Sequence, residues 1–327
     1  MKVLNVIFAV ILTLVMLYIT QVNSVGHSQH ATAEENGYSF EITTVPKGLE
    51  NTTEQLDVRI VGPLEYNTKL YIRYRWKNEG NVSALKSYTK SLLRLSNPIT
   101  GEYSWNVLTP QRGSKMYYYF EVDNNDDNAV ARFFNSNGRP FLYRSIGHVP
   151  LYILIPHIFF MFSAFFFVSL ASITAVSVIR GNTDDLRKVF LYLFGGVVAT
   201  LIGGYAFGLP MNWFAFGTIW EGVPFGTDAT DNKTQLLFFY FLFVTLSGLG
   251  TLTRGKIGRD LFSAKALGWL GLSAFFFMLF IFLIPHSIQF SAGFTYAFCY
   301  SVIGILALIY IISLLRARSR NSRGLQG

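Results

Sequence analysis

Two histidines in this sequence end the same tetrapeptide, Leu-Ile-Pro-His, one at His157 and the other at His286. Each copy lies at the edge of a long apolar run. Imidazoles ligate haem iron and transition metals, so two of them at one level of a membrane could hold haem b or a metal ion between them. The alternative is that each imidazole bonds a backbone carbonyl at a helix end. The histidines do not have the spacing of a known cytochrome, which favours the alternative.

A second candidate is the segment 210–233, in which aromatic residues, glycines and prolines precede several charged residues. Its aromatic part could fold back onto the membrane surface as a lid and bring carboxylates toward the two histidines. A purely structural interpretation is an interfacial aromatic belt, with Thr230 or Asp231 as the N-cap of the next helix and Lys233 paired with an acid. We expect an ordered lid whose candidate residues are Trp213, Trp220, Glu221, Asp228, Asp231 and Lys233.

Other metal ligands are few in the sequence. His27 and His30, in Gly-His-Ser-Gln-His, could bind Cu(II) or Zn(II), although a flexible leader with two histidines is more often inert. Residues 123–128 have the composition of a calcium loop, but they lack the glycine and the distal glutamate of an EF-hand, which favours a polar hairpin tip. The sequence contains no nucleotide-binding, hydrolase or zinc-protease motif. It therefore favours a protein that is not an enzyme.

The composition indicates a membrane protein. Hydrophobic residues make up 51% of the 327 residues, and charged residues make up 14%, against about a quarter in soluble chains. Five apolar runs each have about the 20 residues that a spanning helix requires. They cover residues 157–178, 189–209, 235–252, 266–284 and 294–315. This series predicts a multi-pass helical bundle with the lipid bilayer as its main partner.

The formal net charge of +8 reflects membrane topology and indicates no nucleic-acid partner. Lys and Arg gather after the first, third and last apolar runs, and the positive-inside rule places such clusters in the cytoplasm. The basic tail 317–327 is then cytoplasmic, whereas residues 38–147 and 210–233 are exported. Charged residues are missing from within the apolar runs, which disfavours an ion pump or transporter.

The N-terminal half predicts an exported β domain. Residues 1–24 have the pattern of a secretory signal cut after Ser24, or of a retained anchor helix, and residues 25–37 that of a flexible leader. Residues 38–147 alternate in short runs, which predicts an antiparallel β-sandwich. The expected strands are 39–45, 55–61, 69–76, 103–108, 115–122, 129–135 and 141–146. The predicted fold class is an all-β sandwich followed by a five-helix membrane domain over residues 148–316.

Two sets of residues carry resemblances to known proteins. Gly101-Glu-Tyr-Ser-Trp-Asn-Val and Gly113-Ser-Lys-Met-Tyr-Tyr-Tyr-Phe-Glu-Val-Asp resemble paired strands of fibronectin-III-like and immunoglobulin-like domains, which implies a fold and no ligand. Residues 220–234 and the Pro-His-Ile and Pro-His-Ser helix ends resemble a set of bacterial multi-pass membrane proteins. That resemblance implies architecture and a bacterial cytoplasmic membrane, and it assigns no activity.

Two classes of function fit these features. The first is a non-catalytic envelope protein whose sandwich binds a protein or a glycan, and whose helices anchor it or join a larger membrane complex. The second is a redox or metal-handling protein with haem b or a metal at His157 and His286. The sequence shows no catalytic motif, which favours the first class. A visible absorption spectrum separates the two, because bound haem has a Soret band.

Overall fold

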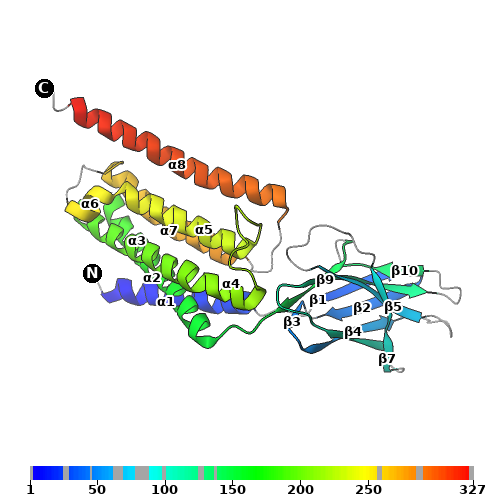
Figure 1. Cartoon of the computed structure of the whole chain (residues 1–327). Helices are drawn as coiled ribbons and strands as arrows, with labels where there is room; N and C mark the ends of the chain where they lie inside the picture. The colour runs from blue at the N-terminus through cyan, green and yellow to red at the C-terminus, as the bar shows by residue number, and fades with distance from the viewer. Residues whose placement is uncertain are drawn as a thin grey trace. The chain divides into compact units, whose positions relative to one another are not determined.

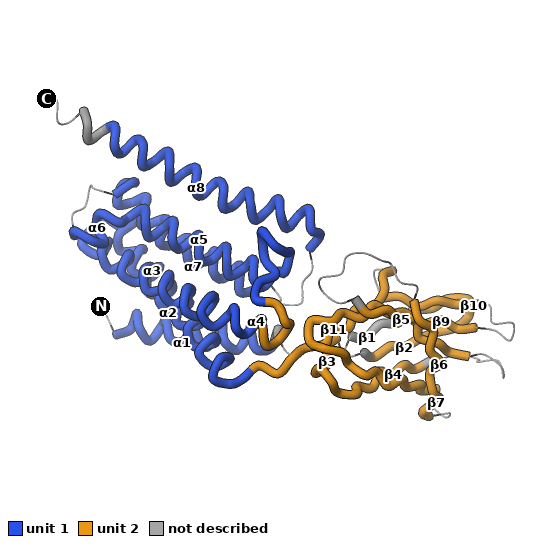
Figure 2. Tube along the Cα trace, in the orientation of Figure 1, with its two compact units in different colours: residues 1–25, 150–211, 219–327 blue, residues 26–149, 212–218 orange. Residues whose placement is uncertain are grey.

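The computed structural model describes residues 3–24, 29–44, 46–61, 69–77, 88–97, 101–123, 129–135, 138–255, 260–284 and 290–323. The chain forms two compact units (Figure 2). The helical unit contains residues 1–25, 150–211 and 219–327, and the sandwich unit contains residues 26–149 and 212–218. The short segment 212–218 therefore belongs with the strands, although it lies far from them in the sequence.

The strands of the sandwich unit form two sheets (Figure 1). Sheet A has the order β1-β2-β4-β8-β7, and sheet B has the order β3-β11-β9-β5-β6, with β10 beside β9. Strand pairs are antiparallel, except that β3 runs parallel to β11. The strands are β1 (Gln29–Glu35), β2 (Tyr38–Thr44), β3 (Lys47–Leu49), β4 (Thr53–Val61), β5 (Lys69–Lys77), β6 (Thr89–Leu92), β7 (Arg94–Asn97), β8 (Glu102–Leu108), β9 (Lys115–Asp123), β10 (Ala129–Phe133) and β11 (Phe141–Ile146).

The core of the sandwich unit follows from the alternation of residues along its strands. In β9, Met116, Tyr118 and Phe120 point inward, because successive side chains of a strand point to opposite faces. They pack against residues of sheet A such as Phe40 and Leu56. The predicted sandwich-like region is thus present, and all seven predicted strands occur, as β2, β4, β5, β8, β9, β10 and β11.

The N-terminal edge of sheet A differs from the sequence prediction. Residues 25–37 were expected to form a flexible leader, but β1 pairs with β2 along its whole length. The turn between the two strands is Asn36-Gly37, and both residues have positive φ, 51° and 83°. Two such residues form the tight turn that matches the twist of a hairpin. Residues 25–28 lie outside the described residues, so the departure from the leader prediction concerns residues 29–37, where the local turn chemistry outweighs the polar composition of β1.

The helical unit consists of long apolar helices with short connections. The second of the predicted spans continues through a π-helical turn at residues 201–207, where i→i+5 hydrogen bonding widens the helix. The helices are α1 (Val3–Ser24), α2 (Leu151–Ile179), α3 (Leu186–Thr200), η2 (Leu201–Phe207), α4 (Gly208–Phe216), α5 (Ala229–Ser247), α6 (Leu249–Arg254), α7 (Ala264–Leu283) and α8 (Ala292–Arg323). The last residues of α4, 212–216, belong to the sandwich unit. A 3-10 turn, η1 (Thr183–Asp185), precedes α3.

Five of the described helices are long and apolar enough to cross a membrane, which indicates membrane association. They cover Val3–Val22, Leu151–Ile179, Thr183–Phe216, Ala264–Leu283 and Ala292–Ser319. The predicted span 235–252 is not among them. Its residues are divided between α5 and α6 at Gly248, and the first turn of α5 is polar. The N-terminal helix α1 contacts α2 and α7, with Met16 buried, and its cleavage stays a prediction.

Helices α2 and α7 pack side by side through small residues. The Ser172 hydroxyl donates to the Gly271 carbonyl at 2.9 Å, and a Cβ on Gly271 would lie 3.3 Å from that of Ala175. Farther along, the Phe162 and Phe282 rings are 5.7 Å apart. The N-terminal part of α2 therefore lies beside the C-terminal part of α7. Small residues let two apolar helices approach closely, which is the usual way such helices associate in membranes.

Candidate functional site

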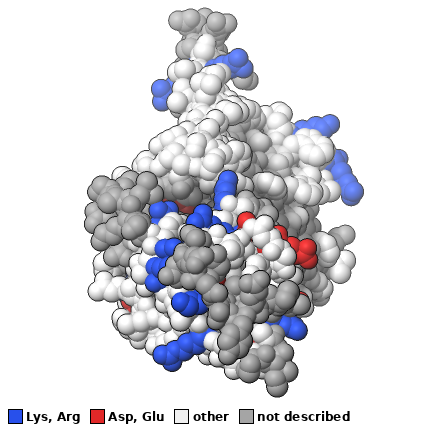
Figure 3. Space-filling model, turned by 90° about the vertical axis from the view of Figure 1, so that its right-hand side faces the viewer, with Lys and Arg blue, Asp and Glu red and all other residues white. Residues whose placement is uncertain are grey.

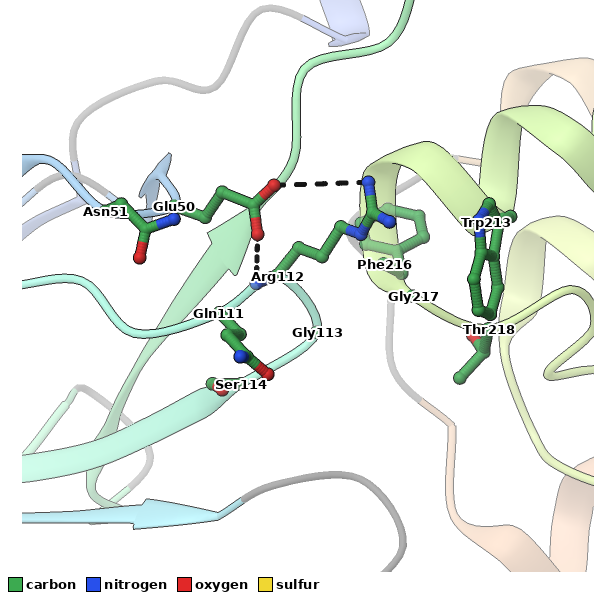
Figure 4. Close-up of a pocket in the computed structure, with 10 residues that line it drawn as sticks. All are labelled: Glu50, Asn51, Gln111, Arg112, Gly113, Ser114, Trp213, Phe216, Gly217 and Thr218. Carbon is green, nitrogen blue, oxygen red and sulfur yellow. Dashed lines mark hydrogen bonds and ion pairs between the residues drawn. The ribbon is translucent and has the colours of Figure 1, made fainter.

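The sandwich unit contains an open pocket of about 550 Å³. Three parts of the chain line it: the turn after β3, the turn between β8 and β9, and the segment 212–218. Figure 4 shows the Glu50 carboxylate joined to Arg112, with the Trp213 ring standing across from them. The lining residues are Glu50, Asn51, Gln111, Arg112, Gly113, Ser114, Trp213, Phe216, Gly217 and Thr218, all within the sandwich unit.

The turn that carries Glu50 is fixed by its backbone. The Glu50 amide donates to the Ile146 carbonyl at 2.8 Å, and the Asn51 amide donates to the Thr109 carbonyl at 3.0 Å. Asn51 has a φ of 59°, in the left-handed region that Asn adopts more readily than most residues. The buried Thr109 hydroxyl also contacts the Leu49 carbonyl. The Glu50 carboxylate is therefore presented from a rigid turn.

Arg112 connects the three parts of the pocket. Its amide donates to Glu50 Oε2 at 2.9 Å, and its Nη1 lies 4.0 Å from Glu50 Oε1. The same Nη1 donates to the Phe214 carbonyl at 3.2 Å. The guanidinium lies 5.6 Å from the centre of the Trp213 ring, within cation–π range. This arrangement fixes the cation while its side chain stays 27% exposed.

The segment 212–218 is held against the strands by main-chain contacts. The Gly147 amide donates to the Ala215 carbonyl at 2.8 Å, and the Arg144 guanidinium lies 4.0 Å above the Phe216 ring. Two glycines make this close approach sterically feasible. A Cβ on Gly147 would overlap the Phe214 carbonyl oxygen, and one on Gly113, which has a φ of 84°, would overlap the Phe216 carbonyl oxygen.

The pocket offers hydrogen-bonding groups on one side and an aromatic plane on the other. Glu50, Asn51, Gln111 and Arg112 carry planar polar groups, each with two or more adjacent donor or acceptor atoms. Such groups match vicinal hydroxyls, which donate and accept at the same time. The Trp213 ring is 47% exposed and gives an apolar surface on which a ring can stack. The chemistry of the pocket thus fits a sugar ring.

The remainder of the 210–233 segment forms an ordered loop in the helical unit. The Glu221 amide donates to Asp231 Oδ2 at 2.6 Å, and the Val223 amide donates to Asn232 Oδ1 at 2.8 Å. The Trp220 indole stacks on Tyr205 with ring centres 5.7 Å apart, and its Nε1 donates to the Val223 carbonyl at 3.3 Å. These bonds fix the loop onto the first turn of α5, and a ligand-binding role for its carboxylates stays a prediction.

The start of α5 differs from the expected capping. The N-cap is Asp228, which accepts from the amides of Thr230 and Asp231, whereas Thr230 or Asp231 was expected. The helix begins earlier because Asp228 has extended backbone angles and a side chain that reaches both amides. Lys233 was expected to pair with an acid. Its Nζ instead donates at 2.8 Å to the carbonyl of Ile284, the C-cap of α7, where a cation stabilises the free carbonyls of a helix end.

His157 lies in the first turns of α2 and bonds the π-helical turn. Its Nδ1 is 2.9 Å from the Gly203 carbonyl oxygen, so Nδ1 carries the proton and Nε2 is left to accept or to ligate. Among the described residues, this imidazole forms no hydrogen bond or ion pair with the carboxylates of Glu221, Asp228 and Asp231. His286 and His27 lie outside the described residues. His30 lies in β1, opposite Thr43.

The described residues contain no group of three or more His, Cys, Asp and Glu side chains that could hold a metal ion. The structure brings Trp213 into the pocket, and it places Trp220, Glu221, Asp228, Asp231 and Lys233 in the loop at α5. Glu50 and Arg112 were not predicted from the sequence. The Arg112-Gly113 pair between two strands was the available signal, because such a glycine often marks a close approach of two backbones.

Comparison with known proteins identifies no relative by sequence. No protein-family model matches the chain, and no curated protein matches it. A solved structure of Astrotactin-2, described as a vertebrate-specific, perforin-like membrane protein involved in neuronal development, is similar over 78% of this chain. The identity is 8% and the TM-score is 0.27, and the match spans 38% of the Astrotactin-2 chain. A likeness this weak supports no conclusion about the fold or the function.

Proposed function

We propose that this chain is a membrane-anchored binding protein whose sandwich unit takes a sugar-containing ligand in the pocket of Glu50, Arg112 and Trp213. The observation that carries the proposal is the pairing of an exposed indole with the Glu50 carboxylate and the Arg112 guanidinium, which are held by contacts with each other and with the main chain. Binding pockets commonly combine an apolar surface with a few well-placed polar groups that set specificity. The helices then anchor the binding unit, alone or within a larger membrane complex.

The lining favours binding over hydrolysis of the sugar. Glycosidases use two carboxylates that flank the scissile bond. Among the described residues that line the pocket, Glu50 is the one with a carboxylate, and it is engaged by Arg112. A single carboxylate held by a guanidinium can accept hydrogen bonds from hydroxyls. It cannot supply the acid and base pair of a hydrolase.

The binding proposal is tested with the full-length protein in detergent on an array of neutral and amino sugars. We expect binding to at least one sugar, with affinity at least tenfold lower for Trp213→Ala and Arg112→Ala, because each removes one side of the pocket. A tenfold loss corresponds to about 1.4 kcal/mol. Arg59→Ala, on the outer face of sheet A, is the control and should bind like the wild type. Equal binding by all four proteins, or binding by none, contradicts the proposal.

We propose a bacterial cytoplasmic membrane as the location, with the sandwich unit exported and the C-terminus inside. The support is the segregation of Lys and Arg at the helix ends. A reporter enzyme that is active only outside should be inactive when fused after Gly255 or at the C-terminus. The same reporter should be active when inserted at Gly138, an exposed turn of the sandwich unit. Reversed activities would show the opposite orientation.

A second candidate function is haem or metal handling at His157 and His286. The observation that favours it is the hydrogen bond from His157 Nδ1 to a carbonyl, because a ligating histidine usually has its other nitrogen fixed in this way. The contact between α2 and α7 also brings together the two helices that carry the Leu-Ile-Pro-His copies at their ends.

The cofactor prediction is tested by a visible spectrum and metal analysis of the purified protein. We expect a Soret band or a stoichiometric metal that both His157→Ala and His286→Ala remove, since ligation fails when either partner is lost. Asp228→Ala serves as a control that disturbs the neighbouring loop without removing an imidazole. A colourless and metal-free wild-type protein would mean that His157 only links α2 to the π-helical turn.

A further inference from the structure

The outer face of sheet B, on the opposite side from the sandwich core, combines cations with tyrosines. Along β5 and β9 the residues that point outward alternate with the core residues. Arg73 lies opposite Tyr119, Arg75 lies opposite Tyr117, and Lys90 of β6 lies opposite Arg73. In the view of Figure 3, Lys and Arg side chains are spread over the described surface, whereas Asp and Glu show at few places.

The carboxylates of this face lie beneath its cations. Glu121 accepts from Arg73 at 2.7 and 2.9 Å and from Arg132 at 3.0 Å, and Asp123 pairs with Lys90. The side chains of Glu121 and Asp123 are 1% and 0% exposed, whereas those of Arg73, Lys90 and Arg132 are 27%, 26% and 55% exposed. The buried carboxylates therefore orient the basic side chains, and it is the basic side chains that are exposed to solvent.

Arg75 is held by aromatic rings. Its guanidinium lies 4.8 Å from the centre of the Tyr88 ring and 5.6 Å from that of Tyr117. Among the described residues it forms no ion pair, so its planar donors are directed by stacking alone. Lys90 similarly lies 4.1 Å from the centre of the Tyr71 ring. Stacked arginines keep their donors available for a bidentate anion.

Stability alone gives a weak reason for this arrangement. Burying two carboxylates requires their desolvation, and buried ion pairs often stabilise a fold no better than apolar residues do. Arg and Tyr are, in contrast, the residues enriched where partners bind most strongly. Cations two residues apart along one strand are about 7 Å apart, with flat rings on the neighbouring strands. A polymer that repeats flat rings and negative charges matches this pattern along the sheet.

We propose that the outer face of sheet B binds an acidic polysaccharide, with its carboxylate or sulfate groups on Arg73, Arg75, Lys90 and Arg132. The face differs from the pocket of Glu50 and Trp213, and the proposal does not rest on sugar binding there. Anionic groups pair with the guanidinium forks, and sugar rings lie against the tyrosines. Counterion release makes such binding to a polyanion weaken steeply as salt rises.

The test uses the full-length protein in detergent with immobilised heparin and polygalacturonate, and with neutral dextran and poly-glutamate for comparison. At 150 mM salt we expect both acidic polysaccharides to bind. Arg75→Gln should lower the affinity for each of them at least tenfold, and Arg75→Lys should lower it less. Arg59→Gln removes the same charge from sheet A and should leave binding unchanged. Arg75→Gln should leave sugar binding in the pocket unchanged, because Arg75 does not line it, and this separates the face from the pocket.

Three outcomes would overturn the proposal. The first is equal weakening by Arg59→Gln, which would mean attraction by net charge alone. The second is tighter binding of poly-glutamate than of either polysaccharide, which would indicate an acidic protein as the partner. The third is no binding of either polysaccharide. If Arg75→Gln fails to fold, Arg132→Gln provides the same comparison, because its side chain is the most exposed of the cations paired with Glu121.

Discussion

Replacing Glu121 with Ala will lower the free energy of unfolding of the sandwich unit by about 2–4 kcal/mol. Removing one partner of a buried, hydrogen-bonded charge pair typically has an effect of about 3–5 kcal/mol. The expected effect is somewhat smaller than this because Arg73 and Arg132 are partly exposed and can turn to water. Urea unfolding of the full-length protein in detergent, followed by tryptophan fluorescence, measures it, since Trp76 and Trp105 pack against the sandwich core.

The matched control is Glu41→Ala. Glu41 also pairs with an arginine of a neighbouring strand, at 3.3 Å from Arg59, but its side chain is 52% exposed. Exposed ion pairs contribute about 0–1 kcal/mol, so the two variants should differ clearly in their urea midpoints. Equal midpoints would show that the buried carboxylate does not stabilise the outer face of sheet B.

The stabilisation by Glu121 should also depend on pH. Burial by itself raises the pKa of Glu121, but hydrogen bonds and charges from Arg73 and Arg132 outweigh it and lower the pKa below the ordinary 4.5. A carboxyl with a lowered folded pKa stabilises the fold fully above its unfolded pKa, and this stabilisation is lost as the pH falls through the folded value. The difference in unfolding free energy between the wild type and Glu121→Gln should therefore be constant near neutral pH and shrink below about pH 4.

The fold was predictable from the sequence where periodicity is strong. β5 and β9 alternate over nine residues each and were placed within one residue of their bounds. β3, β6 and β7 were missed because they have only three or four residues each and are stabilised by their neighbours in the sheet. β1 was missed although Asn36-Gly37 was a direct hairpin signal. The turn residues thus indicated a hairpin that the polar composition of β1 did not indicate.

The candidate sites were less predictable, since they depend on which loops meet. Trp213 was singled out from the sequence, but Arg112 lies about a hundred residues earlier, and no periodicity connects the two. Glu121 occupies an outward position of β9, which usually means a solvated residue. Its burial arises from cations on β5 and β10, so only the pairing of the strands shows it. The sequence gives the residue types, but the register of strand pairing determines which side chains surround each of them.

Gly147 lies where the strands, the turn of Glu50 and the segment 212–218 converge. A Cβ at this position would overlap the Phe214 carbonyl oxygen and lie 2.7 Å from Arg112 Cδ and 3.2 Å from Glu50 Oε1. The backbone cannot easily move away, because the Gly147 amide itself donates to the Ala215 carbonyl. An added methyl group therefore strains all three parts of the pocket at once.

We expect Gly147→Ala to raise the population in which the segment 212–218 is released from the strands, and to weaken sugar binding in the pocket. Overpacking of this kind typically amounts to about 1–3 kcal/mol, which raises the released population by roughly 5-fold to 150-fold. The rate of chymotrypsin cleavage after Phe214 or Phe216, followed by mass spectrometry, measures that population when the segment returns to the strands faster than it is cleaved. Gly293→Ala is the control, because its Cβ would meet no atom within 4 Å. Equal cleavage rates in the two variants would mean that the segment is not held by the Gly147 contact.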